Sequence, residues 1–354
     1  MRKKAILTGL QLMISCALFA QEKPFDPADY ETVTVRSDKP AVFRQEVQVP
    51  VANDSFRLKG VFTRPGKDGK HPAILLLPGS VNYNLDAAVF PADALEQIAQ
   101  RFAEEGFAVL YYDDRPAAVN GSYATIARDA ADVLRELRSF PQVDPRRTGI
   151  VAHNTGAAAG LMVAAQDTAL RFFVPMAAQG AESPATMAHF MSAVHANKDP
   201  GFRERVAREG DVLMKIAGAG QSRDSLLQQL KRAAIGFERA FRQEKKIPDN
   251  AETGYALMLI QTYSLPEMTA FAAYRPALYM DQVKCPVLAV FGGNDELMAP
   301  SVHSAAWQRE IPSATIQAFP GMNHYLSKSG GKQPSDSVLK EIAGWMQGVV
   351  KTNP

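Results

Sequence analysis

Cysteine is scarce in this 354-residue sequence, which contains only Cys16 and Cys285. A small domain held together by disulfides is therefore excluded, and stability must come from a hydrophobic core. Hydrophobic residues make up 46% of the chain and charged residues 21%, proportions typical of a globular protein. The length allows one large domain or two modest ones.

The sequence also lacks an excess of charge of either sign. It has 39 basic residues against 37 acidic ones, and three of the basic residues, Arg2, Lys3 and Lys4, lie at the very start. Without those three, 39 becomes 36, so the remainder is almost neutral. Such a balance gives no reason to expect nucleic acid or an anionic membrane as a partner.

The uncharged apolar stretch near the amino terminus is short for a membrane span. This stretch, Ala5 to Ala20, follows the basic start and precedes the polar run Gln21 to Pro24. A spanning helix needs roughly 20 apolar residues. The layout instead predicts a secretory signal peptide over residues 1–20, then an extended leader over 21–40, and a secreted or periplasmic protein. Cys16 resembles a lipid attachment site, but the apolar stretch continues beyond it, which argues against a lipid anchor.

Alternating strand and helix patterns begin near residue 41. The first two strand-like runs, Phe43 to Val51 and Phe56 to Thr63, alternate in polarity as half-buried antiparallel strands do. Later apolar runs, which alternate with amphipathic helical segments, predict buried strands at 72–78 and 107–112 and further strands at 148–152, 172–178, 286–291 and 315–319. We therefore expect a mostly parallel central sheet with helices on both faces. Pro175 is unusual because a central strand needs the N–H that proline lacks.

One long stretch breaks this alternation. Residues 181–275 show helical patterns without a strong strand, and they are rich in charge and methionine. Such an insert between two strands predicts a helical cap over the carboxyl edge of the sheet, where ligands bind in open α/β folds. The predicted core domain then comprises residues 41–180 and 276–354.

Three segments at strand ends carry the residue types of a hydrolytic site. Ala152-His153-Asn154-Thr155-Gly156 has the small flanking residues of a nucleophile elbow, a tight turn between a strand and a helix. Asp295 follows the strand at 286–291, and His324 follows the strand at 315–319. The order nucleophile, acid and histidine is the one that this kind of fold uses.

The sequence resembles the α/β-hydrolase superfamily, and within it a bacterial branch of carboxylesterases. The similar segments are LLLPGS (75–80), LYYDDR (110–115), VDPRRTGIVAHNTG (143–156), KCPVLAVFGGNDELMAP (284–300) and PGMNHYL (320–326). The resemblance implies hydrolysis of esters, usually with short acyl groups. It also implies Asp295 as the triad acid, His324 as the general base, and an oxyanion hole formed by the N–H of Thr155 with that of Ser80 or Val81.

The sequence departs from that family at three places along the expected rim of the site. The elbow serine is Asn154, the glycine-rich residues after YDDR are Pro116-Ala117-Ala118, and the loop after PGS is Val81 to Leu85. A carboxamide has no ionisable hydroxyl, so it cannot form an acyl-enzyme as serine does. We therefore expect a chain that is inactive, or nearly so, as an esterase.

Two alternatives remain open. The first is a non-catalytic binding protein that uses the same pocket for an ester or another small molecule. Alternatively, Asn154 stands for the aspartate nucleophile of dehalogenase-type or epoxide-hydrolase-type relatives, with Tyr255 or Tyr263 as the activating hydroxyl. No cofactor or metal is expected, since His189 and His195, six residues apart, lie on different faces of a helix. No feature indicates an oligomeric state.

Overall fold

The computed structural model describes residues 41–51, 57–79, 92–113, 122–195, 198–248, 253–328 and 330–352. The predicted signal peptide and leader therefore lie outside the described residues. Among the residues described, no helix combines the length and apolar character needed to cross a membrane.

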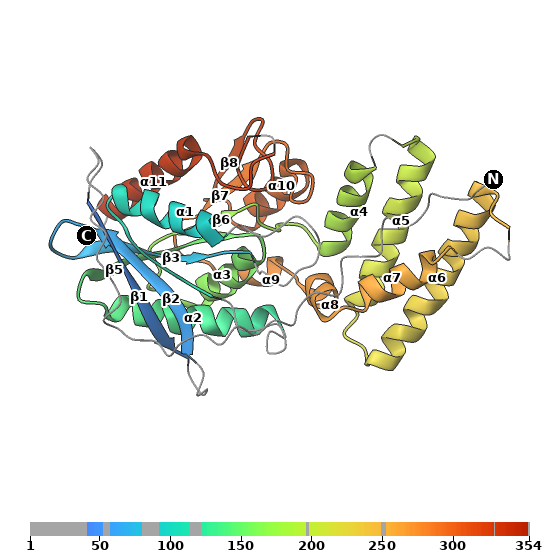
Figure 1. Ribbon diagram of the computed structural model, residues 1–354, viewed down its shortest axis with the longest axis horizontal. Helices are drawn as coiled ribbons and strands as arrows, with labels where there is room; N and C mark the ends of the chain where they lie inside the picture. Colours follow the sequence, from blue (N-terminus) through green and yellow to red (C-terminus); the bar gives the residue numbers. More distant parts are fainter. Residues whose placement is uncertain are drawn as a thin grey trace, which may run out of the picture. The chain divides into compact units, whose positions relative to one another are not determined.

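An eight-stranded sheet in the order β1-β2-β4-β3-β5-β6-β7-β8 forms the centre of the fold (Figure 1). Its strands are β1 (Val42–Pro50), β2 (Arg57–Pro65), β3 (His71–Leu77), β4 (Ala108–Tyr112), β5 (Val143–His153), β6 (Phe173–Met176), β7 (Leu288–Gly292) and β8 (Thr315–Phe319). The pairs β1–β2 and β2–β4 are antiparallel, and the remaining neighbours are parallel. The polarity patterns predicted this division, because the first two strands alternate while later ones such as β4 and β7 are continuously apolar.

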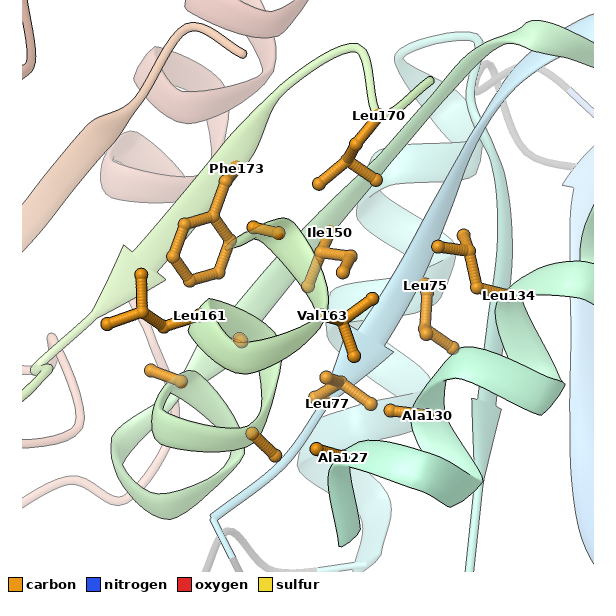
Figure 2. Close-up of a cluster of buried hydrophobic side chains, with 14 of the residues drawn as sticks. Leu75, Leu77, Ala127, Ala130, Leu134, Ile150, Leu161, Val163, Leu170 and Phe173 are labelled. Atoms are coloured by element: carbon orange, nitrogen blue, oxygen red, sulfur yellow. The ribbon is translucent and has the colours of Figure 1, made fainter. Parts of the chain in front are cut away.

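Helices cover both faces of the sheet and bury two separate apolar clusters. Along β3, Leu75 and Leu77 point toward α2 (Tyr123–Ser139) and α3 (Asn154–Gln166), as Figure 2 shows. The alternate residues Ile74 and Leu76 belong to the cluster under α1 (Ala92–Glu104) and α11 (Asp336–Lys351). This alternation follows from the strand period of two, and it makes every core strand apolar on both sides.

Pro175 lies inside β6 despite the expected conflict with a central strand. The N–H groups of Phe173 and Ala177 donate to Pro286 and Val290 on the β7 side, so Pro175 occupies the one intervening position that would donate there. The β6–β7 ladder is accordingly reduced to the pair Met176 and Val290, with an isolated bridge between Phe173 and Val287. The proline is thus accommodated by weak pairing on one side only.

Between β6 and β7 the chain forms a helical insertion, which we define as α4 (Ser183–Val194), α5 (Pro200–Ala217), α6 (Arg223–Lys245), α7 (Tyr255–Tyr263) and α8 (Pro266–Ala273). It has its own apolar cluster, in which Met187, Leu213 and Met214 are buried. The two ends of the insertion are tied together, because Ser183 Oγ donates to the carbonyl of Phe271 and Arg275 forms a 2.9 Å ion pair with Glu182. After α9 (Ala277–Met280) the chain returns to the sheet, where α10 (Pro300–Glu310) separates β7 from β8.

Candidate active site

Asn154 occupies a tight turn between β5, which ends at His153, and α3, which begins at Asn154 itself. Its φ of 47° lies in the left-handed region, which asparagine tolerates better than most residues do. The turn is closely packed. A Cβ on Gly156 would stand 2.2 Å from the carbonyl oxygen of Pro78, which explains why the elbow pattern requires glycine there.

Asp295 lies in the loop that follows β7, and its carboxylate is held by backbone groups. Oδ1 accepts from the N–H of Leu297 at 2.9 Å and of Met298 at 2.8 Å. Burial raises the pKa of this carboxyl, but the neighbouring His324 and the Met298 N–H outweigh burial, so the pKa lies below its ordinary value. Asp295 is therefore an ionised, fixed acceptor.

His324 lies in the loop after β8, and backbone contacts join this loop to the Asp295 loop. The N–H groups of Gly293 and Asn294 donate to the carbonyls of Phe319 and Met322, each at 2.8 Å. A Cβ on Gly292 would stand 2.1 Å from the carbonyl oxygen of Asn323, so the two loops touch without room for a side chain. The positions of the acid and the histidine are thus mutually dependent.

The structure brings Asn154, His324 and Asp295 into one hydrogen-bonded chain. His324 Nδ1 lies 2.8 Å from Asp295 Oδ2, and Asn154 Nδ2 lies 3.0 Å from His324 Nε2. Because a carboxylate can only accept, Nδ1 carries the proton and Nε2 presents its lone pair to the amide N–H. In this tautomer His324 is poised to accept a proton from whatever group stands at position 154.

His153 is buried behind the elbow and supports the backbone of His324. Its Nε2 donates to the backbone carbonyl of His324 at 2.9 Å, and the two rings lie 4.8 Å apart in a T-shaped arrangement. Burial, together with the neighbouring His324, lowers the pKa of His153 to about 3. The ring therefore stays neutral and retains the tautomer that makes this bond.

His303 performs a similar structural task on α10. Its Nδ1 accepts from the N–H groups of Gly180 and Ala181, each at 3.1 Å, at the point where the chain leaves β6 for the helical insertion. Burial lowers the pKa of His303 to about 4, so it remains an acceptor near neutral pH. Sequence analysis missed this residue because an isolated histidine on a helix carries no motif.

The two depressed histidine pKa values predict acid destabilisation. In the unfolded chain both rings take up a proton near pH 6.5, whereas in the folded protein they resist until about pH 3 and pH 4. The contribution of these two neutral rings to the free energy of unfolding is therefore fully present above about pH 6.5. It decreases as the pH falls, by up to about 1.4 kcal/mol per pH unit for each ring. Urea unfolding at pH 7, 6 and 5 measures this slope. His303→Asn retains a hydrogen-bond acceptor but does not titrate. We expect it to reduce the slope by about 1.4 kcal/mol per pH unit, the effect of one proton. An unchanged slope would contradict the neutral state of His303 in the folded protein.

Of the expected oxyanion-hole residues, only Thr155 lies in the described part of the chain. Thr155 lies in the first turn of α3, directly after Asn154. Ser80 and Val81 lie outside the described residues, as do the rim residues Pro116 to Ala118. The position of the second N–H donor therefore stays a prediction.

Comparison with known proteins supports the fold. No family model and no curated protein sequence matches the chain. Among solved structures it is similar to a hypothetical protein from Pseudomonas aeruginosa (TM-score 0.53, 16% identity, covering 90% of this chain and 99% of that one). It is also similar to Est1E from Butyrivibrio proteoclasticus (0.50, 14%, 86% and 99%) and to a protein described as a dienelactone hydrolase from Klebsiella pneumoniae (0.51, 12%, 88% and 99%). With its mostly parallel sheet and helices on both faces, the chain has the α/β-hydrolase fold.

Proposed function

We propose that this chain is a carboxylic-ester hydrolase by lineage whose nucleophile has been replaced by Asn154, so that ester cleavage is nearly absent. The observation that carries the proposal is the hydrogen-bonded chain from Asn154 through His324 to Asp295. Two of its members have the residue types and the tautomer of a hydrolytic triad. The third has the position of a nucleophile without the chemistry of one.

The asparagine preserves the arrangement while removing the reaction. Its amide N–H donates to His324 Nε2 as a serine hydroxyl would, so the imidazole keeps its orientation. The amide nitrogen lone pair is delocalised into the carbonyl, however, and does not attack an acyl carbon at a useful rate. Losing the serine of such a triad costs about a million-fold in turnover.

A non-catalytic binding protein is the second candidate, and a covalent probe separates the two. We expect a serine-directed fluorophosphonate to leave the unaltered chain unlabelled and to label Asn154→Ser, measured by intact mass. Asn154→Ala is the matched control, because it removes the amide without supplying a hydroxyl. If Asn154→Ser also stays unlabelled while remaining folded, the site has lost more than its nucleophile and a binding role is favoured.

An aspartate-type hydrolase for epoxides has less support from the described residues. The Tyr255 hydroxyl donates to Glu209 inside the helical insertion. Burial, together with Glu209, raises the pKa of Tyr263 to about 12, and this residue packs in the apolar cluster of the insertion. Both hydroxyls are thus engaged or buried within the insertion.

We further propose that the helical insertion acts as the cap over the carboxyl edge of the sheet. Met187 and Met214 pack inside it, which favours a structural use of these methionines.

Secretion by a signal peptide over residues 1–20 also stays a proposal. Sequencing the amino terminus of exported protein tests it, with Gln21 expected first.

A further inference from the structure

The carboxamide of Asn154 is held like a substrate amide beside a general acid and base. Its nitrogen, the atom that would leave on hydrolysis, lies 3.0 Å from His324 Nε2. The other ring nitrogen is held by Asp295, whose second oxygen accepts two backbone N–H bonds. Among the described asparagines with side-chain contacts, Asn323 differs, because its Nδ2 donates to the carbonyl of Gly331.

We propose that the protein hydrolyses the side-chain amide of Asn154 itself and thereby converts this position to aspartate. His324 Nε2 first releases the amide N–H, and water then adds its oxygen to Cγ as Nε2 takes one of the water protons. The Cγ–Nδ2 bond then breaks as the imidazolium returns that proton to nitrogen. The overall reaction is carboxamide plus water to carboxylate plus ammonium, and it requires no other reactant.

Each neighbouring group has a defined part in this reaction. His324 moves the proton, and Asp295 holds the imidazole in the required tautomer and stabilises its positive charge. Helix α3 begins at Asn154, so the positive end of its dipole favours the negative charge that develops at this position. Asn154 retains 8% of its surface exposed, so the residue is not completely closed to solvent.

The product is also favoured electrostatically. A carboxylate at position 154 lies at a helix N-terminus, a stabilising place for an anion. It also faces His324, which gains a second carboxylate partner when it is protonated. The result is a carboxylate where a covalent hydrolase would place its nucleophile, so the inference extends the proposed function by describing how this chain acquires one.

The test follows the peptide that contains position 154 by mass spectrometry while the purified full chain is kept folded at neutral pH in heavy-oxygen water. We expect progressive conversion to aspartate with one labelled oxygen. His324→Ala should slow it by at least about 100-fold, the lower range for general acid–base catalysis. Asn323 in the same sample is the internal control for spontaneous deamidation and should stay an amide.

The isomer formed separates this route from ordinary deamidation. Attack by the Thr155 backbone nitrogen passes through a cyclic imide and yields a mixture with isoaspartate, whereas direct hydrolysis yields aspartate alone. Abundant isoaspartate, equal rates in His324→Ala, or no conversion would each overturn the inference. The outcome is independent of the proposed function, because fluorophosphonate labelling of Asn154→Ser tests the pocket without any conversion at position 154.

Discussion

Asn154→Ser is expected to raise kcat/KM for p-nitrophenyl acetate and butyrate by at least about a thousand-fold over freshly purified unaltered chain. Loss of a triad serine costs about a million-fold, while roughly a thousand-fold over water survives from the oxyanion hole and binding. The difference is what a restored nucleophile can recover. In this chain His324 already presents the Nε2 lone pair that a serine hydroxyl needs.

The size of the gain depends on one geometric adjustment. A serine Oγ takes the place of the asparagine Cγ, so it starts farther from His324 than Nδ2 does, by at most the length of one amide bond, about 1.3 Å. Catalytic hydrogen bonds are often long in unliganded enzymes and tighten when substrate binds. We therefore expect the gain to appear mainly in kcat, where proton transfer to His324 is expressed.

The controls separate a restored triad from other sources of hydrolysis. The double variant Asn154→Ser with His324→Ala should fall to the level of Asn154→Ala, since a hydroxyl without its base is a weak nucleophile. Rapid hydrolysis by the unaltered chain would show that the nucleophile lies elsewhere. No gain in a folded Asn154→Ser protein would indicate that the departures at Pro116 and Val81 have also dismantled the site.

Gly156→Ala is expected to destabilise the protein by about 3 kcal/mol or more. The new Cβ would stand 2.2 Å from the carbonyl oxygen of Pro78 and 2.6 Å from that of Leu77. Both are backbone atoms, so neither yields as the end of a flexible side chain would. Overpacking of a rigid interior typically costs about 1–3 kcal/mol and occasionally more. The measurement is the free energy of unfolding in urea at neutral pH.

Gly344→Ala is the matched control in the same chain. Gly344 lies in the exposed middle of α11, and a Cβ there meets nothing within 4 Å. The same chemical change should then stabilise the protein by about 0.5–1 kcal/mol, the ordinary advantage of alanine in a helix. Equal effects at the two positions would mean that the elbow is not packed as closely as described.

Sequence patterns predicted the strands and the elbow well because both depend on local residue types. Residues 315–319 formed the strand expected from their composition, and the glycine at 156 marked the tight turn. The fold class followed from the alternation of strands and helices, which the sheet order confirms. The α3 helix begins at Asn154, the residue with the left-handed backbone at the turn.

The contacts that hold the site together were beyond the reach of sequence patterns. The bonds from His153 to the His324 carbonyl and from Gly180 and Ala181 to His303 join residues more than one hundred positions apart. Such pairings depend on where the strands end in space, and no spacing along the chain encodes that. The sequence could not show that Pro175 is accommodated in β6 for the same reason. The cost of its missing N–H depends on which neighbouring strand that group would face.

The weak pairing between β6 and β7 separates two sets of strands, β1 to β6 and β7 with β8, which contribute different residues to the candidate site. Asn154 follows β5 in the first set, whereas Asp295 follows β7 and His324 follows β8 in the second. If the chain were cut within the helical insertion, each fragment would hold an incomplete site. The bonds from Asn154 and His153 to His324 would then form only on reassociation. The site is therefore complete only when both fragments associate. A split Asn154→Ser protein would report fragment complementation through its esterase activity.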